Sequence, residues 1–135
     1  MMKTTKTMKP ALLRLLSGFA FSSLLFAAGG RPLLQQPPEK EIDRLNPYQQ
    51  LDEPQRARAA KAGQKLFKNE CAACHGESAQ GTRIAPALVS PALRQTPPGA
   101  VFWVLRNGSL RRGMPSFAHL PDQRRWQIVT YLQTP

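Results

Sequence analysis

Two cysteines three positions apart, followed directly by a histidine, stand at Cys71, Cys74 and His75. At this spacing, one turn of chain can bring both sulfurs to the two vinyl groups on one edge of a porphyrin. The adjacent imidazole can then swing under the ring and offer a nitrogen to the iron. The motif therefore predicts one covalently attached haem c with its iron.

Two other uses of a Cys-x-x-Cys pair compete with this prediction. A redox dithiol of the thioredoxin type needs a βαβ context, and no alternating strand pattern surrounds position 71. A zinc site needs about four nitrogen or sulfur ligands. The chain could supply them only by using both cysteines, His75 and His119, which are all the cysteines and histidines it has. Haem attachment is the interpretation that requires the fewest additional features.

Haem iron takes a ligand on each face, and few residues can supply the second one. Met114 is the only methionine after position 8, His119 is the only other histidine, and no lysine follows Lys68. Gly113 and Pro115 flank Met114 and predict a stiff loop that holds its sulfur at a fixed place. Ligation by His and Met raises the reduction potential relative to two nitrogen ligands. With both faces occupied, the iron has no open position for oxygen, which favours electron transfer over catalysis. His119 competes with Met114 as the second ligand.

The first 30 residues have the pattern of a secretory signal peptide. Four basic residues precede an apolar stretch over 15–28, and small residues at 27–30 can supply the cleavage site. The apolar stretch is shorter than the roughly 20 residues that span a membrane comfortably. We therefore predict export to the periplasm, with an uncleaved N-terminal anchor as the alternative. Membrane contact is expected only in that second case.

The remaining 105 residues suffice for one small domain. The leader contains four of the 19 basic residues and none of the eight acidic ones, so the remainder has a net charge of +7. Because nucleic acid is not expected outside the cytoplasm and the basic residues are scattered, the charge indicates a solvated surface with a docking role. Haem uses both cysteines, so no disulfide is expected. We predict a monomer that meets other redox proteins.

The chain before the domain is rich in proline. Residues 31–53 contain four prolines and predict a linker or arm. Within it, Asn46-Pro47-Tyr48 either folds back onto the domain or belongs to a disordered linker. The domain itself is expected over 54–135, because the pattern becomes helical at Pro54.

Small and apolar residues at helical spacing predict helices at about 54–70, at 97–107 and from 121 onward. Thr96 is the expected N-cap of the second helix. Two glycines and two prolines over 76–95 predict a loop with at most a short turn. No segment alternates as a strand does. The predicted fold is all-α, with three main helices and long connecting loops.

Over residues 56–134 the chain resembles the class I c-type cytochromes. CAACH at 71–75 is the attachment motif of that family without alteration, and Gly113-Met114-Pro115-Ser116-Phe117 is similar to its distal methionine loop. The 39-residue step from His75 to Met114 resembles the small bacterial members with a single haem. The resemblance implies the class I cytochrome c fold around one covalent haem, with His75 and Met114 as axial ligands of the iron.

Two further segments carry the resemblance. Ala85-Pro86-Ala87-Leu88 is similar to the family segment whose proline carbonyl accepts the Nδ1 proton of the haem histidine, so Pro86 would fix the imidazole ring. Gly63 and Phe67 resemble the small-plus-aromatic pair that packs on the C-terminal helix. Their partners here would be Ile128 and Tyr131.

These features predict a periplasmic single-haem cytochrome that carries single electrons between redox partners and is not itself an enzyme. The alternative is a dedicated haem subunit of a periplasmic dehydrogenase or oxidase complex. A ligand-binding or sensing cytochrome, or a peroxidase, would need a labile sixth ligand. Arg111 and Arg112, beside the methionine loop, either are simply solvated or flank the exposed haem edge, bind a propionate or dock an acidic partner. Trp103 lines the haem pocket or fills core between helices. Trp126 is expected to pack on the first helix, with a haem contact as the alternative.

Overall fold

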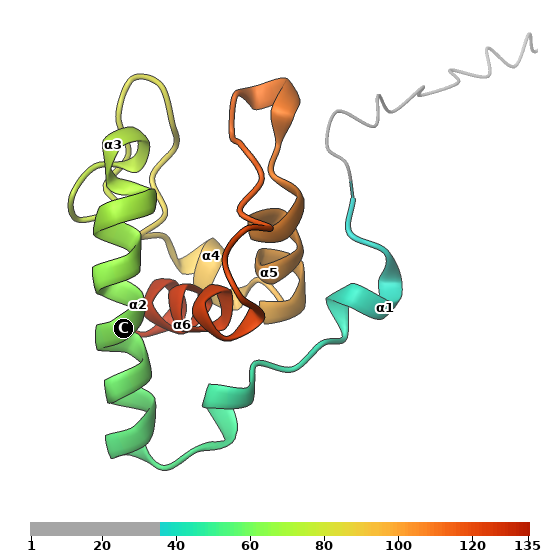
Figure 1. Ribbon diagram of the computed structural model, residues 1–135, viewed down its shortest axis with the longest axis vertical. Coiled ribbons are helices and arrows are strands. Elements are labelled where there is room, and N and C mark those ends of the chain that lie inside the picture. The colour runs from blue at the N-terminus through green and yellow to red at the C-terminus, as the bar shows by residue number, and fades with distance from the viewer. Residues whose placement is uncertain (1–35) are drawn as a thin grey trace, which may run out of the picture. The chain divides into compact units, whose positions relative to one another are not determined.

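Within residues 36–135, three helices of ten or more residues form the frame: α2 (Glu53–Glu70), α5 (Pro98–Asn107) and α6 (Asp122–Gln133). A computed structural model describes residues 36–135. Figure 1 shows α2 lying against α6, with α5 on the other side of α6. The shorter elements are α1 (Glu39–Ile42), η1 (Pro47–Gln50), α3 (Ala72–His75), α4 (Pro91–Gln95) and η2 (Leu110–Arg112).

The described residues contain no β-strand, and one isolated bridge joins Ser109 to Met114. The all-α prediction is therefore confirmed. Within 36–135, none of the helices combines the length and the apolar character that crossing a membrane requires. The predicted signal peptide at 1–30 lies outside the described residues.

Helices α2 and α6 cross at a glycine. A Cβ atom at Gly63 would stand 1.9 Å from the carbonyl oxygen of Gln127 and 3.0 Å from the amide nitrogen of Ile128. Next to this crossing, the rings of Phe67 and Tyr131 pack with centroids 5.5 Å apart. The expected packing of Gly63 and Phe67 on Ile128 and Tyr131 is confirmed. Only a residue without a side chain lets the two backbones approach this closely.

The face of α6 toward α5 has a different aromatic contact. Trp126 stacks on Phe102 of α5 with ring centroids 4.2 Å apart and an angle of 22° between the planes. The expectation that Trp126 packs on the first helix is therefore wrong. Trp126 and Tyr131 are five positions apart, which turns them about 140° around the helix, so they serve different faces.

Helix boundaries follow the predicted pattern, with one exception at a cap. Asp52 caps α2, because its side chain accepts a hydrogen bond of 2.9 Å from the amide of Gln55. Thr96 does not cap α5, which begins after Pro97 without a side-chain cap. Instead Thr96 ends α4, a short helix in the stretch expected to be a loop with at most a turn. Its hydroxyl donates to the Ala92 carbonyl at 2.8 Å.

The proline-rich segment before α2 lies against the helices over residues 36–52. Asn46 is fully buried and donates from Nδ2 to the Thr130 hydroxyl of α6 at 2.9 Å, while its Oδ1 accepts from the Tyr48 amide. The Arg44 guanidinium lies over the Phe102 ring at 4.5 Å. Of the two alternatives for Asn46-Pro47-Tyr48, the structure has the one that folds back.

Candidate haem-binding site

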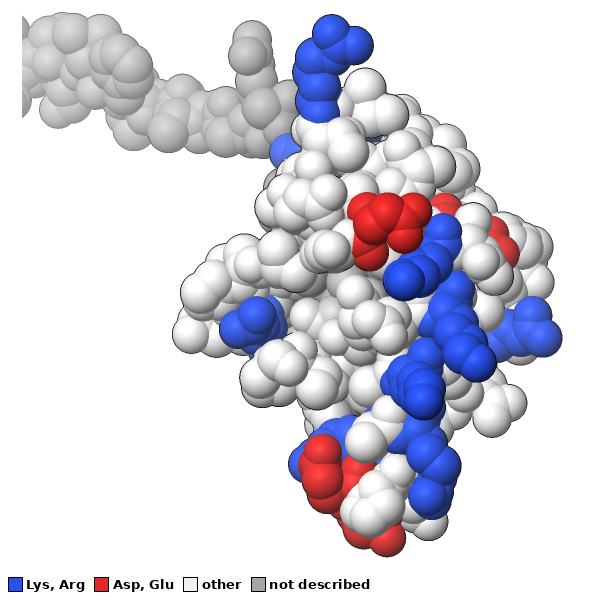
Figure 2. Space-filling model, turned by 90° about the vertical axis from the view of Figure 1, so that its left-hand side faces the viewer, with Lys and Arg blue, Asp and Glu red and all other residues white. Residues whose placement is uncertain are grey.

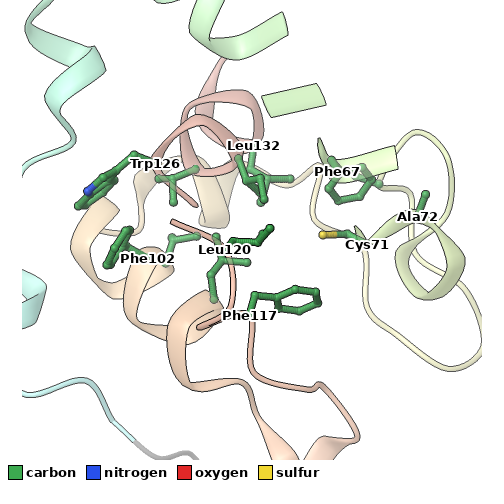
Figure 3. Close-up of a cluster of buried hydrophobic side chains, with 13 residues drawn as sticks. Phe67, Cys71, Ala72, Phe102, Phe117, Leu120, Trp126 and Leu132 are labelled. Carbon is green, nitrogen blue, oxygen red and sulfur yellow. The ribbon is translucent and has the colours of Figure 1, made fainter. Parts of the chain in front are cut away.

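The C-terminus of α2 delivers the two cysteines and the histidine. Cys71 ends α2 and donates its amide to the Phe67 carbonyl at 2.8 Å, and its own carbonyl accepts from the His75 amide at 2.9 Å. One turn of helix, α3, then holds Cys74 and His75 on consecutive positions. Cys71 is buried in the apolar cluster and Cys74 is exposed. In Figure 3 the Cys71 sulfur points toward the interior of this cluster, which also contains Phe117.

The imidazole of His75 is oriented by a backbone carbonyl. His75 is 9% exposed, and its Nδ1 lies 2.8 Å from the carbonyl oxygen of Pro86. A carbonyl oxygen can only accept, so Nδ1 carries the proton and Nε2 keeps its lone pair. The predicted contact between His75 and Pro86 is therefore present. It leaves Nε2 as the nitrogen that can bind a metal.

Backbone hydrogen bonds keep the loop that carries Pro86 in place. The Gly81 amide donates to the His75 carbonyl at 2.8 Å, and the Leu88 amide donates to the Ala79 carbonyl at 2.7 Å. The Thr82 hydroxyl donates to the Cys74 carbonyl at 2.6 Å. Because the loop is tied to the motif itself at two of these contacts, the Pro86 carbonyl is held relative to the ring that it orients.

Met114 stands at the base of a narrow hairpin. Ser109 and Met114 exchange two backbone hydrogen bonds of 2.9 and 3.2 Å, and η2 forms the turn between them. Gly108, at φ +73°, approaches so closely that a Cβ there would stand 2.7 Å from the Met114 carbonyl oxygen. The Met114 side chain is partly buried and packs against the apolar cluster. Arg111 and Arg112 lie exposed at the hairpin turn.

A buried arginine supports the segment that follows Met114. Arg125 of α6 is 4% exposed and donates from one terminal nitrogen to the carbonyls of Phe117, at 3.0 Å, and Leu120, at 2.6 Å. Its other terminal nitrogen pairs with Asp122. Sequence reasoning missed this residue, because one arginine in the run Arg124-Arg125 has no local signal of burial beyond its place on the inner face of α6.

The remaining candidate residues lie in less specific surroundings. His119, the competing iron ligand, is exposed, and its Nε2 lies 3.8 Å from a carboxylate oxygen of Glu70. Trp103 of α5 is buried at 9% exposure, and its carbonyl accepts a hydrogen bond from Asn107. The structure describes Trp103 as a buried side chain, and its role in a haem pocket stays a prediction.

Burial changes the acidity of one of the two thiols. It raises the pKa of Cys71 from 9.0 to about 11, with smaller contributions in the same direction from the Glu70 carboxylate and from Cys74. The charged form of a thiol is disfavoured when water is excluded from it. Cys71 is therefore a neutral thiol at physiological pH in the haem-free chain.

The residues gathered at this place fit a covalent haem. The two free thiols and an imidazole with an available Nε2 are the donor set that haem c needs. Apolar side chains around Cys71 would cover the porphyrin face, namely Phe67, Ala72, Phe117 and Leu120. A thioether sulfur stands on a separate, braced loop. No group of three or more His, Cys, Asp or Glu side chains able to hold a bare metal ion occurs within residues 36–135.

A match to a known protein family agrees with these observations. Residues 58–132 match the protein family described as cytochrome C oxidase, cbb3-type, subunit III. No curated protein matches the chain. Among solved structures, cytochrome CL from the marine methylotrophic bacterium Methylophaga aminisulfidivorans MPT is similar, with 26% sequence identity and a TM-score of 0.49. That similarity covers 56% of this chain and 54% of the other, so the chain spans about half the length of the cytochrome CL structure.

Proposed function

We propose a function from one premise: the chain belongs to the family of cytochrome C oxidase, cbb3-type, subunit III. It is a small class I c-type cytochrome, a haem protein that transfers electrons with one covalently bound haem c. Beyond this premise we propose that Cys71 and Cys74 hold the porphyrin and that His75 and Met114 are the axial ligands. The protein then carries single electrons between redox partners, in the periplasm.

The observation that carries the ligand assignment is the hydrogen bond between His75 and the Pro86 carbonyl. It fixes the tautomer and the orientation of the ring, as partners of metal-bound histidines commonly do. Met114 fits the role of the second ligand, because its hairpin and its partly buried side chain keep the thioether beside the same apolar cluster. The exposed His119 lacks such support.

When bound, haem supplies a reversible one-electron change between ferric and ferrous iron. The chain contributes everything else. The Pro86 carbonyl restrains the imidazole, the hairpin restrains Met114, and Arg125 restrains the segment after it. Phe67, Phe117 and neighbouring apolar side chains exclude water from the site. Apolar, water-free surroundings raise the reduction potential of the haem iron. A rigid site changes little between the two redox states, which is what rapid electron transfer needs.

An optical titration of the holoprotein tests the axial pair. The ferric protein should show the weak near-infrared band of sulfur-to-iron charge transfer, and Met114→Ala should abolish it and let the ferrous iron bind carbon monoxide. His119→Ala is the matched control and should keep the band. If the band persists in Met114→Ala, or disappears in His119→Ala, the assignment of Met114 is wrong. Ready binding of carbon monoxide by the unaltered protein would favour a sensing or peroxidase role.

A second candidate function is that of a dedicated haem subunit in an oxidoreductase complex. The observation that favours it is the description of the matching family as an oxidase subunit. The docked segment 36–52 would then lie next to its partner as a preformed surface. Gentle purification from native membranes and periplasm separates the two functions. A free monomer supports the carrier, and co-purification with an oxidase or dehydrogenase at constant ratio supports the subunit.

The proposed location follows from the leader. Export of the chain through residues 1–30 would place it where c-type haem is attached. Mass spectrometry of the protein from the periplasmic fraction measures the mature N-terminus. Cleavage near residue 30 supports a soluble periplasmic protein, whereas an intact leader in the membrane fraction supports the anchored alternative.

A further inference from the structure

The solvent face of α2 carries a row of positive charge. Its four members, Arg58, Lys61, Lys65 and Lys68, are all exposed and follow each other at intervals of three or four residues. At about 100° per residue they fall within roughly 80° of the helix circumference, and at 1.5 Å per residue they span about 15 Å. Figure 2 shows lysine and arginine side chains in a column along this face. We refer to these four residues as the α2 basic row.

No acidic side chain neutralises this row. Between Glu53 and Glu70 the chain contains no Asp or Glu. Glu53 pairs with Arg56, and a carboxylate oxygen of Glu70 lies 3.8 Å from Nε2 of His119, so neither flanking carboxylate forms an ion pair with a member of the row. No ion pair among residues 36–135 involves a member of the row. Neighbouring cations at these spacings repel one another and destabilise the helix slightly. A negatively charged partner would relieve that repulsion.

The opposite face of α2 bears on whether the anionic partner is an acidic protein or a lipid bilayer. Ala59, Gly63 and Phe67 are buried there against α6 and are not available to another surface. A helix that binds a membrane surface inserts an apolar face below the headgroups. Because α2 has no such free face, the row can act only through charge. This favours an acidic protein over a lipid bilayer.

The row also lies in a useful place for an electron-transfer protein. Lys68 is three positions before Cys71, and the same helix ends at the haem-attachment motif. A partner docked along α2 is therefore held beside the residues that bind the haem. We propose that the α2 basic row is a docking surface for an acidic protein, with carboxylates that extend over about 15 Å. The redox nature of that partner rests on the proposed function; the docking itself does not.

Binding of a defined acidic polypeptide to the holoprotein tests the proposal. The probe is a short poly-L-glutamate peptide, added at low ionic strength to ¹⁵N-labelled ferrous holoprotein and followed by amide chemical shifts. Shifts should concentrate in residues 58–68. Arg58→Glu/Lys65→Glu should weaken binding about tenfold and flatten its salt dependence, because each reversal replaces an attraction by a repulsion. The control Arg94→Glu/Arg124→Glu changes the same total charge at exposed sites elsewhere and should weaken binding less than about twofold.

Any of four other outcomes would overturn the docking proposal. Equal weakening by both double variants would mean that only net charge matters. Loss confined to Arg111→Glu/Arg112→Glu would move the site to the methionine hairpin. Binding to phosphatidylglycerol vesicles without binding to poly-L-glutamate would assign the row to lipid. The Arg58→Glu/Lys65→Glu protein should keep its thermal midpoint, because the alternating signs now attract along the helix; a lowered midpoint would indicate a structural role. None of these readouts depends on the axial ligands, so the docking proposal and the ligand assignment fail separately.

Discussion

Gly63 of α2 and Gln127 of α6 approach so closely that a Cβ on the glycine would stand 1.9 Å from the glutamine carbonyl oxygen. The obstructing atom belongs to the backbone, so it cannot move aside without separating the helices. Helix α2 ends at the haem-attachment motif, and α6 carries Arg125, which supports the segment after Met114. This crossing therefore sets the distance between the two halves of the candidate site.

Gly63→Ala should lower the free energy of unfolding by at least about 2 kcal/mol, because the added methyl group forces the crossing apart. Guanidinium unfolding of the ferric holoprotein, followed by haem absorbance, measures the effect. Gln64→Ala, at the next and exposed position, is the control and should change stability by less than about 0.5 kcal/mol. Equal stabilities of the two variants would contradict the close crossing.

Arg125→Met should destabilise the protein by about 2–4 kcal/mol, because the Leu120 carbonyl loses its donor and the Phe117 carbonyl keeps only the Leu120 amide. The variant should also bind carbon monoxide more readily in the ferrous state, since the segment after Met114 loses its support. Arg124→Met, at the exposed neighbour, should change neither property. If carbon monoxide binding stays unchanged while stability falls, Arg125 has a structural role only.

Asn46→Ala should release the segment before α2. The side chain is fully buried and hydrogen-bonds to Thr130 and to the Tyr48 amide, so its loss should cost about 1–3 kcal/mol. Limited proteolysis of the holoprotein should then cut residues 36–52 faster than in the unaltered protein. The exposed Gln49 provides the control, and Gln49→Ala should leave the cleavage rate as it was. Rapid cleavage of the unaltered protein in this range would argue against a docked segment.

In the haem-free chain, the raised pKa of Cys71 should be visible as slow alkylation. At pH 8 iodoacetamide should modify the buried Cys71 more slowly than the exposed Cys74, and the Cys71 rate should rise with pH through 9 to 11. The unfolded thiol ionises near pH 9.0 and the folded one near 11, so the folded state binds more protons in between. Stability should therefore fall as pH rises across this window. Peptide mapping by mass spectrometry measures both rates, and equal rates at pH 8 would show that Cys71 is not buried.

Local patterns were sufficient for much of this protein. The spacing of Cys71, Cys74 and His75 specifies the haem chemistry, because one turn of chain is all that it involves. Helical periodicity located α2, α5 and α6 to within one or two residues. The contacts of His75 with Pro86 and of Phe67 with Tyr131 followed from the resemblance to class I c-type cytochromes. Met114 stood out because the chain after position 8 contains no other methionine.

What the sequence alone left open depends on which distant segments meet. Thr96 has the side chain of an N-cap, yet it lies at the C-terminal end of α4, where its hydroxyl donates to the Ala92 carbonyl. Whether such a residue caps the following helix depends on the path of the chain on both sides of it. Asn46 is buried because Thr130, 84 positions away, supplies its partner. Arg125 is buried because two loop carbonyls and a ring of α5 surround its guanidinium. Helical periodicity indicates which face of a helix is turned inward. Only the tertiary structure decides which carbonyl, ring or hydroxyl that face contacts.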